Sequence, residues 1–195
     1  MSIQLRPATA PDSAAIHALI AANISAGHLL PRSLDEIEIH AQRFVVAVHG
    51  DQIIGCAELA PLSDTVAEVR SLVVAKAYRG QRNGMALVST LADRARAHGF
   101  ATLCAFTHQP SHFVRLGFSI VPHVWVPEKI AHDCVGCSQF RRCGQYAVSL
   151  PLRAGVARLP ERFAPRRAAV LPRSSVERLR LPLTPVPADA EPVPA

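Results

Sequence analysis

The amino-acid sequence predicts an α/β domain built on a mixed central sheet with helices on both faces, followed by a disordered tail. Over residues 1–152, short β-rich runs alternate with segments whose apolar residues recur at helical spacing. A glycine-containing loop joins one of these runs to a long amphipathic segment. Nine of the sixteen prolines fall in residues 151–195, and proline this dense interrupts helices and inner strands. We therefore expect a folded domain over residues 1–152 and a Pro/Arg-rich tail over residues 153–195.

The composition favours one cytoplasmic domain. The chain has 195 residues, 49% of them hydrophobic and 18% charged, which is enough for one buried core. No apolar run reaches the ~18 residues that span a bilayer, and the first residues lack the pattern of a secretion signal, so we expect no membrane partner. Eight arginines and four acidic residues in 151–195 supply +4 of the net charge of +6. The domain itself is therefore a poor candidate for binding nucleic acid.

The first half of the domain begins with a short strand, Ile3–Arg6. Pro11 suits the first turn of a helix, and the apolar residues that follow it recur at intervals of three and four. A capping box at Ser33 predicts a second, short helix. Three β-rich runs come next, of which the first two flank a hairpin turn: Phe44–Val48, Ile53–Leu59 and Ala67–Val74.

The second half contains the longest helix, Met85–His98, which has one apolar face and is ended by Gly99. A short helix is expected over Ser111–Leu116. The remaining β-rich runs are Thr102–Phe106, Phe118–Val121 and Tyr146–Leu152.

The loop Tyr78–Gly84 lies between a strand that ends at Val74 and the helix that begins near Met85. Such a loop can bind a pyrophosphate, because its backbone N–H groups and the helix N-terminus face the same anion. It is neither a Walker loop nor a three-glycine dinucleotide fingerprint. A tight turn with glycine at positive φ is the alternative interpretation.

With this loop the sequence resembles the GNAT superfamily of acetyl-CoA-dependent N-acetyltransferases. The matching stretches are Val69–Val74, Tyr78–Gly80, Gly84–Leu87 and Leu116–Phe118. The resemblance implies the GNAT fold, in which the fourth and fifth strands part and acetyl-CoA binds between them. It implies main-chain contacts to pantetheine from Leu72 and Val74, and phosphate contacts from Arg79, Gly80, Gly84 and Met85. Arg82 departs from the motif, because it stands where the family has its first glycine.

Three stretches resemble a narrower branch, the amino-acid N-acetyltransferases that include N-acetylglutamate synthases of arginine biosynthesis. They are Leu29–Ser33, Glu68–Val74, and Pro127–Ile130 with Asp133, Cys134 and Cys137 following. The resemblance implies a short, stand-alone enzyme that moves acetyl to the α-amino group of a small amino acid, foremost L-glutamate, by direct attack. The alternatives are an acetyltransferase for another small amine or a protein amino group, and a non-catalytic CoA-binding sensor. A homodimer is compatible with the sequence.

Glu68 is the candidate general base, because a carboxylate in an otherwise apolar strand is costly unless it has a function or a partner. A structural pair with Arg70 is the alternative. The family's usual acid is a tyrosine at the position of Phe113, so a phenol cannot donate the proton here. The amino-acid branch implies Thr107 instead, with His108 and His112 as nearby alternatives.

A planar, bidentate cation holds a substrate carboxylate well, and Arg32 is the first candidate for this contact. Arg70 and Lys129 follow. For each of them a solvated surface position is the alternative.

Cys134, Cys137 and Cys143 lie within ten residues, beside His132. Cys-x2-Cys spacing suits tetrahedral zinc, but a second such pair is missing. We favour reduced cysteines without a metal over a zinc site.

Overall fold

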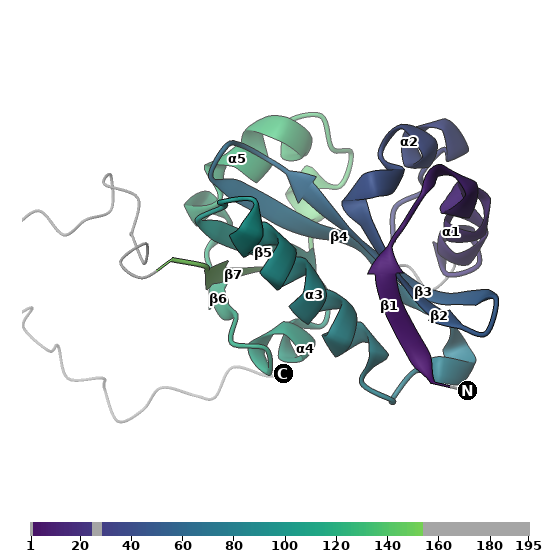
Figure 1. Cartoon of the computed structure of the whole chain (residues 1–195). Coiled ribbons are helices and arrows are strands. Elements are labelled where there is room, and N and C mark those ends of the chain that lie inside the picture. Colours follow the sequence, from purple (N-terminus) through teal and green to yellow (C-terminus); the bar gives the residue numbers. More distant parts are fainter. Residues whose placement is uncertain (1, 25–28, 154–195) are drawn as a thin grey trace, which may run out of the picture. The chain divides into compact units, whose positions relative to one another are not determined.

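Within residues 2–24 and 29–153, which this computed structural model describes, seven strands form one sheet in the order β1-β2-β3-β4-β5-β7-β6. All neighbours are antiparallel except β4 and β5, which are parallel (Figure 1). The sheet is therefore mixed, as predicted. The strands are β1 (Ile3–Pro7), β2 (Phe44–His49), β3 (Gln52–Pro61), β4 (Val66–Val74), β5 (Thr102–Thr107), β6 (Ser119–Val121) and β7 (Tyr146–Pro151).

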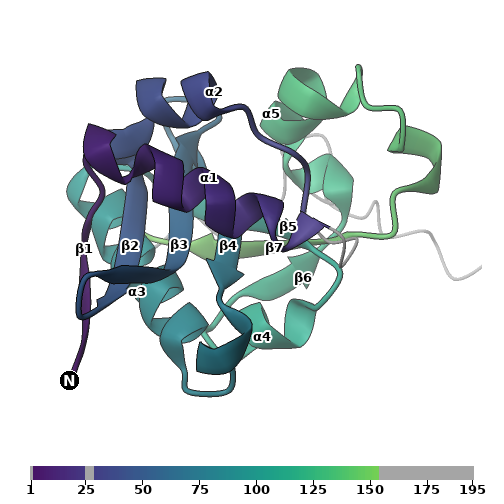
Figure 2. The same ribbon diagram turned by 90° about the vertical axis from the view of Figure 1, so that its right-hand side faces the viewer.

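Helices cover both faces of the sheet, which also agrees with the prediction (Figures 1 and 2). On one face, α3 (Asn83–Ala97) buries Leu87 and Leu91 against the strands, and α4 (Pro110–Val114) adds Phe113 to the same core. On the other face, α1 (Ser13–Ala21) and α2 (Leu34–Ile39) form a second core around Phe44. A short α5 (Pro127–Lys129) continues into a π-helical turn, Ile130–Cys134.

Local sequence signals explain most element boundaries. The Ser33 hydroxyl accepts a hydrogen bond from the Glu36 N–H (3.2 Å), so it caps α2 as expected. The first helix begins at Ser13 rather than at Pro11, because a 3-10 turn, Ala10–Asp12, precedes it. The π-helical turn Ile130–Cys134 had no counterpart in the sequence prediction.

Asp12 fixes the entry into α1. Its carboxylate accepts hydrogen bonds from the Thr9 N–H (2.7 Å) and from the Arg6 guanidinium (2.7 and 2.8 Å), and Arg6 above all lowers the pKa of Asp12. The ionised Asp12 carboxylate therefore stabilises the folded state. This contribution is complete above the pKa of the unfolded chain, about 3.9, and is lost as the pH falls below that value, because the folded-state pKa is lower. We expect Asp12→Asn to flatten the acid limb of the stability profile below about pH 4. Urea unfolding from pH 2 to 7 measures this, and an unchanged acid limb would show that Asp12 does not contribute.

A bulge in β4 shapes the region that the sequence singles out. The β3–β4 register shifts between Cys56 and Glu58, and Ser71 adopts a φ of 49°. The extra residue changes which side chains face α3: Ala67 and Val69 before the bulge, but Leu72 and Val74 after it. The side chain of Ser71 is thereby placed in the cleft described below.

The strands β4 and β5 pair over only three residues, from Val66 with Thr102 to Glu68 with Cys104. Beyond Glu68, β4 continues to Val74, and no strand of the described residues pairs with this edge. β5 instead pairs with β7 along its length. The two parallel strands therefore part, as the resemblance implied.

Contacts divide the chain into two units, Met1–Arg158 and Leu159–Ala195. The predicted tail, apart from Arg153, lies outside the described residues. Among the residues described, no helix has the length and apolarity required to span a bilayer.

Candidate active site

A cleft of about 1140 Å³ opens where β4 and β5 part. Every residue that the sequence predicts for catalysis, cofactor binding or acceptor binding lines it. These are Glu68, Thr107, Leu72, Val74, Arg79, Gly80, Gly84, Met85, Arg32, Arg70 and Lys129. Positions up to 97 residues apart in the sequence, from Arg32 to Lys129, thus border one space.

One end of the cleft is built by the loop before α3. The first backbone N–H groups of an α-helix have no acceptor within the helix, and here they begin at Asn83 beside the cleft. Arg79, Arg82 and Arg115 line the cleft, and none of them has an acidic partner among the described residues. We call this the basic end, and its charge suits a phosphate-bearing ligand.

Arg79 also makes two hydrogen bonds within the domain. Its Nε donates to the Val74 carbonyl (2.9 Å), and its Nη2 donates to the Asn23 side chain. Arg79 therefore connects the end of β4 to the turn that follows α1. Gly84 makes a close approach, because a Cβ there would lie 3.3 Å from the His112 ring.

The middle of the cleft holds the proton-donor candidates. The Thr107 hydroxyl, at the end of β5, accepts from the Gln109 N–H (3.0 Å), so its own hydrogen stays available for donation. Burial lowers the pKa of His112, so its ring is mainly neutral at pH 7, and this makes it a poorer acid. Phe113 packs edge-on against Phe118, with ring centroids 5.2 Å apart, and belongs to the core.

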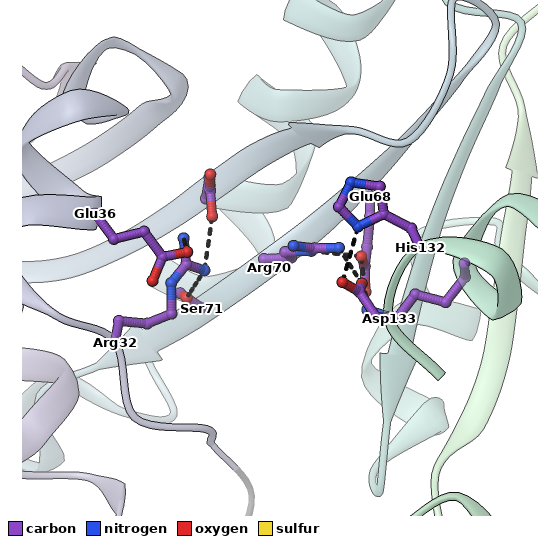
Figure 3. Close-up of polar contacts among 9 residues, drawn as sticks. Arg32, Glu36, Glu68, Arg70, Ser71, His132 and Asp133 are labelled. Atoms are coloured by element: carbon purple, nitrogen blue, oxygen red, sulfur yellow. Dashed lines mark hydrogen bonds and ion pairs between the residues drawn. The ribbon is translucent and has the colours of Figure 1, made fainter. Parts of the chain in front are cut away.

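The other end of the cleft contains the Glu68 cluster, formed by Glu68, Arg70, Lys129 and Asp133 (Figure 3). The Glu68 carboxylate is buried and accepts from Arg70 Nε (2.6 Å) and from Lys129 Nζ (2.8 and 2.9 Å). Asp133 Oδ2 contacts both Lys129 Nζ (2.8 Å) and Arg70 Nη2. Two cations and two carboxylates leave the cluster neutral.

Arg32 belongs to a second group, the Glu58 cluster, with Glu58, Glu36 and Ser71 (Figure 3). Its Nη1 donates to the buried Glu58 carboxylate (2.9 Å) and to the Ser71 hydroxyl (3.3 Å), and its Nη2 contacts Glu36 (2.9 Å). The guanidinium that the sequence predicts for a substrate carboxylate thus already contacts two carboxylates of the chain. Arg70 and Lys129 are likewise paired.

Sequence reasoning missed the acidic partners in these clusters. Glu58 carries the same signal as Glu68, since it is a carboxylate within the apolar run Ile53–Ala60. Asp133 lies four residues after Lys129, a spacing that brings side chains together on a helix, but its contact with Arg70 spans 63 residues and has no local signal.

The comparisons with known proteins agree with this geometry. The family model of the GNAT acetyltransferases matches residues 14–118, more than half of the chain. The chain belongs to the GNAT acetyltransferase family. This confirms the predicted fold and the predicted enzyme class, an acetyl-CoA-dependent N-acetyltransferase.

Two relatives show how far the similarity extends. An uncharacterized N-acetyltransferase of Chlorobaculum tepidum is 29% identical over 144 residues, which cover 74% of this chain and 93% of that protein. An amino-acid acetyltransferase of Shewanella oneidensis is 33% identical over 128 residues, or 65% of this chain and 29% of the relative. The GNAT domain therefore spans less than a third of that amino-acid acetyltransferase.

Solved structures with the same fold include an N-acetylglutamate synthase. The N-acetylglutamate synthase of Neisseria gonorrhoeae, complexed with coenzyme A and N-acetyl-glutamate, matches with a TM-score of 0.69 at 24% identity, covering 78% of this chain and 36% of that one. Rv2747 of Mycobacterium tuberculosis, in complex with CoA and NLQ, matches with a TM-score of 0.66 at 25% identity, covering 77% and 99%. The predicted resemblance to the amino-acid branch is thus confirmed.

Arg82, the departure from the GNAT motif, has a positive φ in the loop before α3. Arg82 adopts the left-handed conformation (φ 63°, ψ 6°) at the N-cap of α3, where glycine would be unstrained.

We expect Arg82→Gly to raise the free energy of unfolding by about 1 kcal/mol, and to weaken CoA binding about fivefold through the loss of one cation. Urea unfolding and calorimetric titration with CoA measure the two effects. Arg82→Ala is the control, because it removes the charge and keeps the strain; equal stability of the two variants would contradict the strain.

The cysteines of the GNAT domain do not form a metal site in the described residues, where no group of three or more histidine, cysteine or acidic side chains is arranged to hold an ion. Cys137 and Cys143 are exposed, and burial raises the pKa of the half-buried Cys134. A raised pKa keeps the Cys134 thiol protonated and makes it a poor ligand or nucleophile.

Proposed function

We propose that this GNAT domain transfers acetyl from acetyl-CoA to the α-amino group of a small amino acid, with L-glutamate as the first acceptor to test. One observation carries the proposal: a single cleft joins a basic end, at the start of α3, to a buried carboxylate, Glu68, that lies between two cations. The basic end suits the phosphates of CoA, and the free edge of β4 suits the pantetheine amides. Leu72 and Val74 would supply main-chain contacts, and Gly80, Gly84 and Met85 backbone contacts to phosphate.

The proposed mechanism uses two residues. Glu68 accepts the proton of the acceptor's ammonium group, and the free amine then attacks the thioester carbonyl directly. The Thr107 hydroxyl donates a hydrogen bond to the departing thiolate, which takes the second proton of the attacking nitrogen and leaves as free CoA thiol. Arg70 and Lys129 hold the acceptor's carboxylate, and Arg32 also lines the cleft, beside Ser71.

Relatives named amino-acid acetyltransferase support an amino-acid acceptor. The N-acetyl-glutamate in the Neisseria gonorrhoeae complex makes L-glutamate the first candidate. Three further points stay predictions: that the chain acts in arginine biosynthesis, that it forms a homodimer and that it is cytoplasmic.

Incubation of the purified chain with acetyl-CoA and a panel of amino acids tests the proposal, with the products identified by mass spectrometry. We expect an N-acetylated amino acid. If only other amines are acetylated, or none while CoA still binds, the proposed acceptor class is wrong. Detection by mass avoids interference from the five cysteines in thiol-based assays.

A further inference from the structure

Asp133 contacts both cations of the Glu68 cluster. Its Oδ2 contacts Lys129 Nζ (2.8 Å) and Arg70 Nη2, and its Oδ1 contacts His132 Nδ1 (2.9 Å). Arg70 comes from β4, whereas Lys129 comes from α5. Two cations from separate elements therefore converge on a single carboxylate oxygen at the wall of the cleft.

The two carboxylates of the Glu68 cluster differ in accessibility. The Glu68 side chain is 4% exposed, whereas the Asp133 side chain is 31% exposed. Asp133 also lies in the π-helical turn Ile130–Cys134, a rare conformation that is frequent at functional sites. Asp133 is thus the outer carboxylate of the cluster, the one that an entering molecule meets first.

Charge decides whether an acceptor's carboxylate can join this cluster. With Asp133 in place, the cluster is neutral, and a further carboxylate would make it negative in a partly buried site, where like charges repel strongly. If the acceptor's carboxylate replaces that of Asp133, neutrality is kept and both cations stay paired. Replacement of the Asp133 carboxylate is therefore favoured over the binding of a third carboxylate.

We propose that Asp133 is an internal competitor, which occupies the carboxylate-binding position of the acceptor site until the acceptor's own carboxylate displaces it. This inference rests on the proposed function and deepens it. A tethered carboxylate competes at an effective concentration of about millimolar or more, so it weakens the binding of every acceptor that carries an α-carboxylate. The affinity for an acceptor without an α-carboxylate does not depend on the displacement of Asp133.

The test compares Asp133→Asn with the wild type on two acceptors that share a side chain: the amino acid that the panel identifies, and its α-carboxamide. We expect the variant to lower KM for the free acid about fivefold, while KM for the amide stays within about twofold and kcat changes little. An unchanged or raised KM for the acid, or an equal change for both acceptors, would overturn the proposal. Asp93→Asn is the matched control, because Asp93 is 73% exposed and, within the described part of the chain, its ion pair is with Arg96 on α3.

Calorimetric titration with CoA verifies that each variant is folded. If Asp133→Asn does not bind CoA, Asp133→Ser removes the same charge with a smaller side chain and takes its place. The wild-type reactions test the proposed function separately: if they yield no acetylated amino acid, that function fails and the competitor role fails with it. If the wild type is active and the variant's KM for the acid does not fall, only the role of Asp133 is wrong.

Discussion

Replacement of Glu68 with glutamine is expected to reduce turnover about 10²- to 10³-fold while acetyl-CoA binding stays within about twofold of the wild type. The amide has the same shape and can still accept hydrogen bonds from Arg70 and Lys129, but it cannot take a proton at neutral pH. Steady-state kinetics and calorimetry measure the two quantities.

The pH profile separates a general base from a structural partner. If Glu68 is the base, kcat/KM of Glu68→Gln should rise steadily with pH, because a growing fraction of the acceptor's amine is already deprotonated. If Glu68 only neutralises Arg70 and Lys129, Glu68→Gln should lower stability and keep the wild-type pH profile. Turnover close to that of the wild type would remove Glu68 from the mechanism.

Replacement of Glu58 with alanine is expected to lower the free energy of unfolding by about 3 kcal/mol. Glu58 is 1% exposed, and its partner Arg32 is 11% exposed, so the change leaves a largely buried guanidinium without its inner carboxylate. Urea unfolding measures the loss. The free energy lost when one partner is removed exceeds the net stabilisation by the pair, because the other charge stays buried without a partner.

Glu36→Ala is the matched control for this effect. Glu36 contacts the same guanidinium at the same distance, 2.9 Å, but its side chain is 43% exposed. We expect it to change the free energy of unfolding by less than about 1 kcal/mol. Equal effects of the two substitutions would show that burial does not distinguish the pairs.

Local patterns were sufficient to predict the seven strands and the helices α1 to α4 in order, but not α5 and the π-helical turn that follows it. Apolar periodicity gave the long helix within two residues of its start, Asn83 rather than Met85, because the apolar face repeats along its whole length. The three observed starts of β2, β3 and β4 lie within one residue of the predicted ones, since turn residues bound each run.

The bulge in β4 could not be predicted, because Ser71 adopts positive φ without the glycine that would signal it. The same limit applies to the site. Glu68 was selected because a carboxylate within an apolar strand is a local anomaly and because the stretch Glu68–Val74 resembles the family; Glu58 shows the same anomaly outside the matching stretches. Its partner Lys129 is 61 residues away, and Asp133 meets Arg70 across 63 residues. Only the fold brings such residues together, so sequence reasoning named the cations as acceptor contacts without the carboxylates that already pair with them.

Calorimetric titration of the purified chain with acetyl-CoA tests most directly whether the parted strands and the start of α3 form a cofactor site. We expect saturable binding at one site per chain with a Kd below about 1 mM. An absence of binding heat at millimolar acetyl-CoA, confirmed at a second temperature, would contradict the assignment of this cleft and every role proposed for the residues that line it.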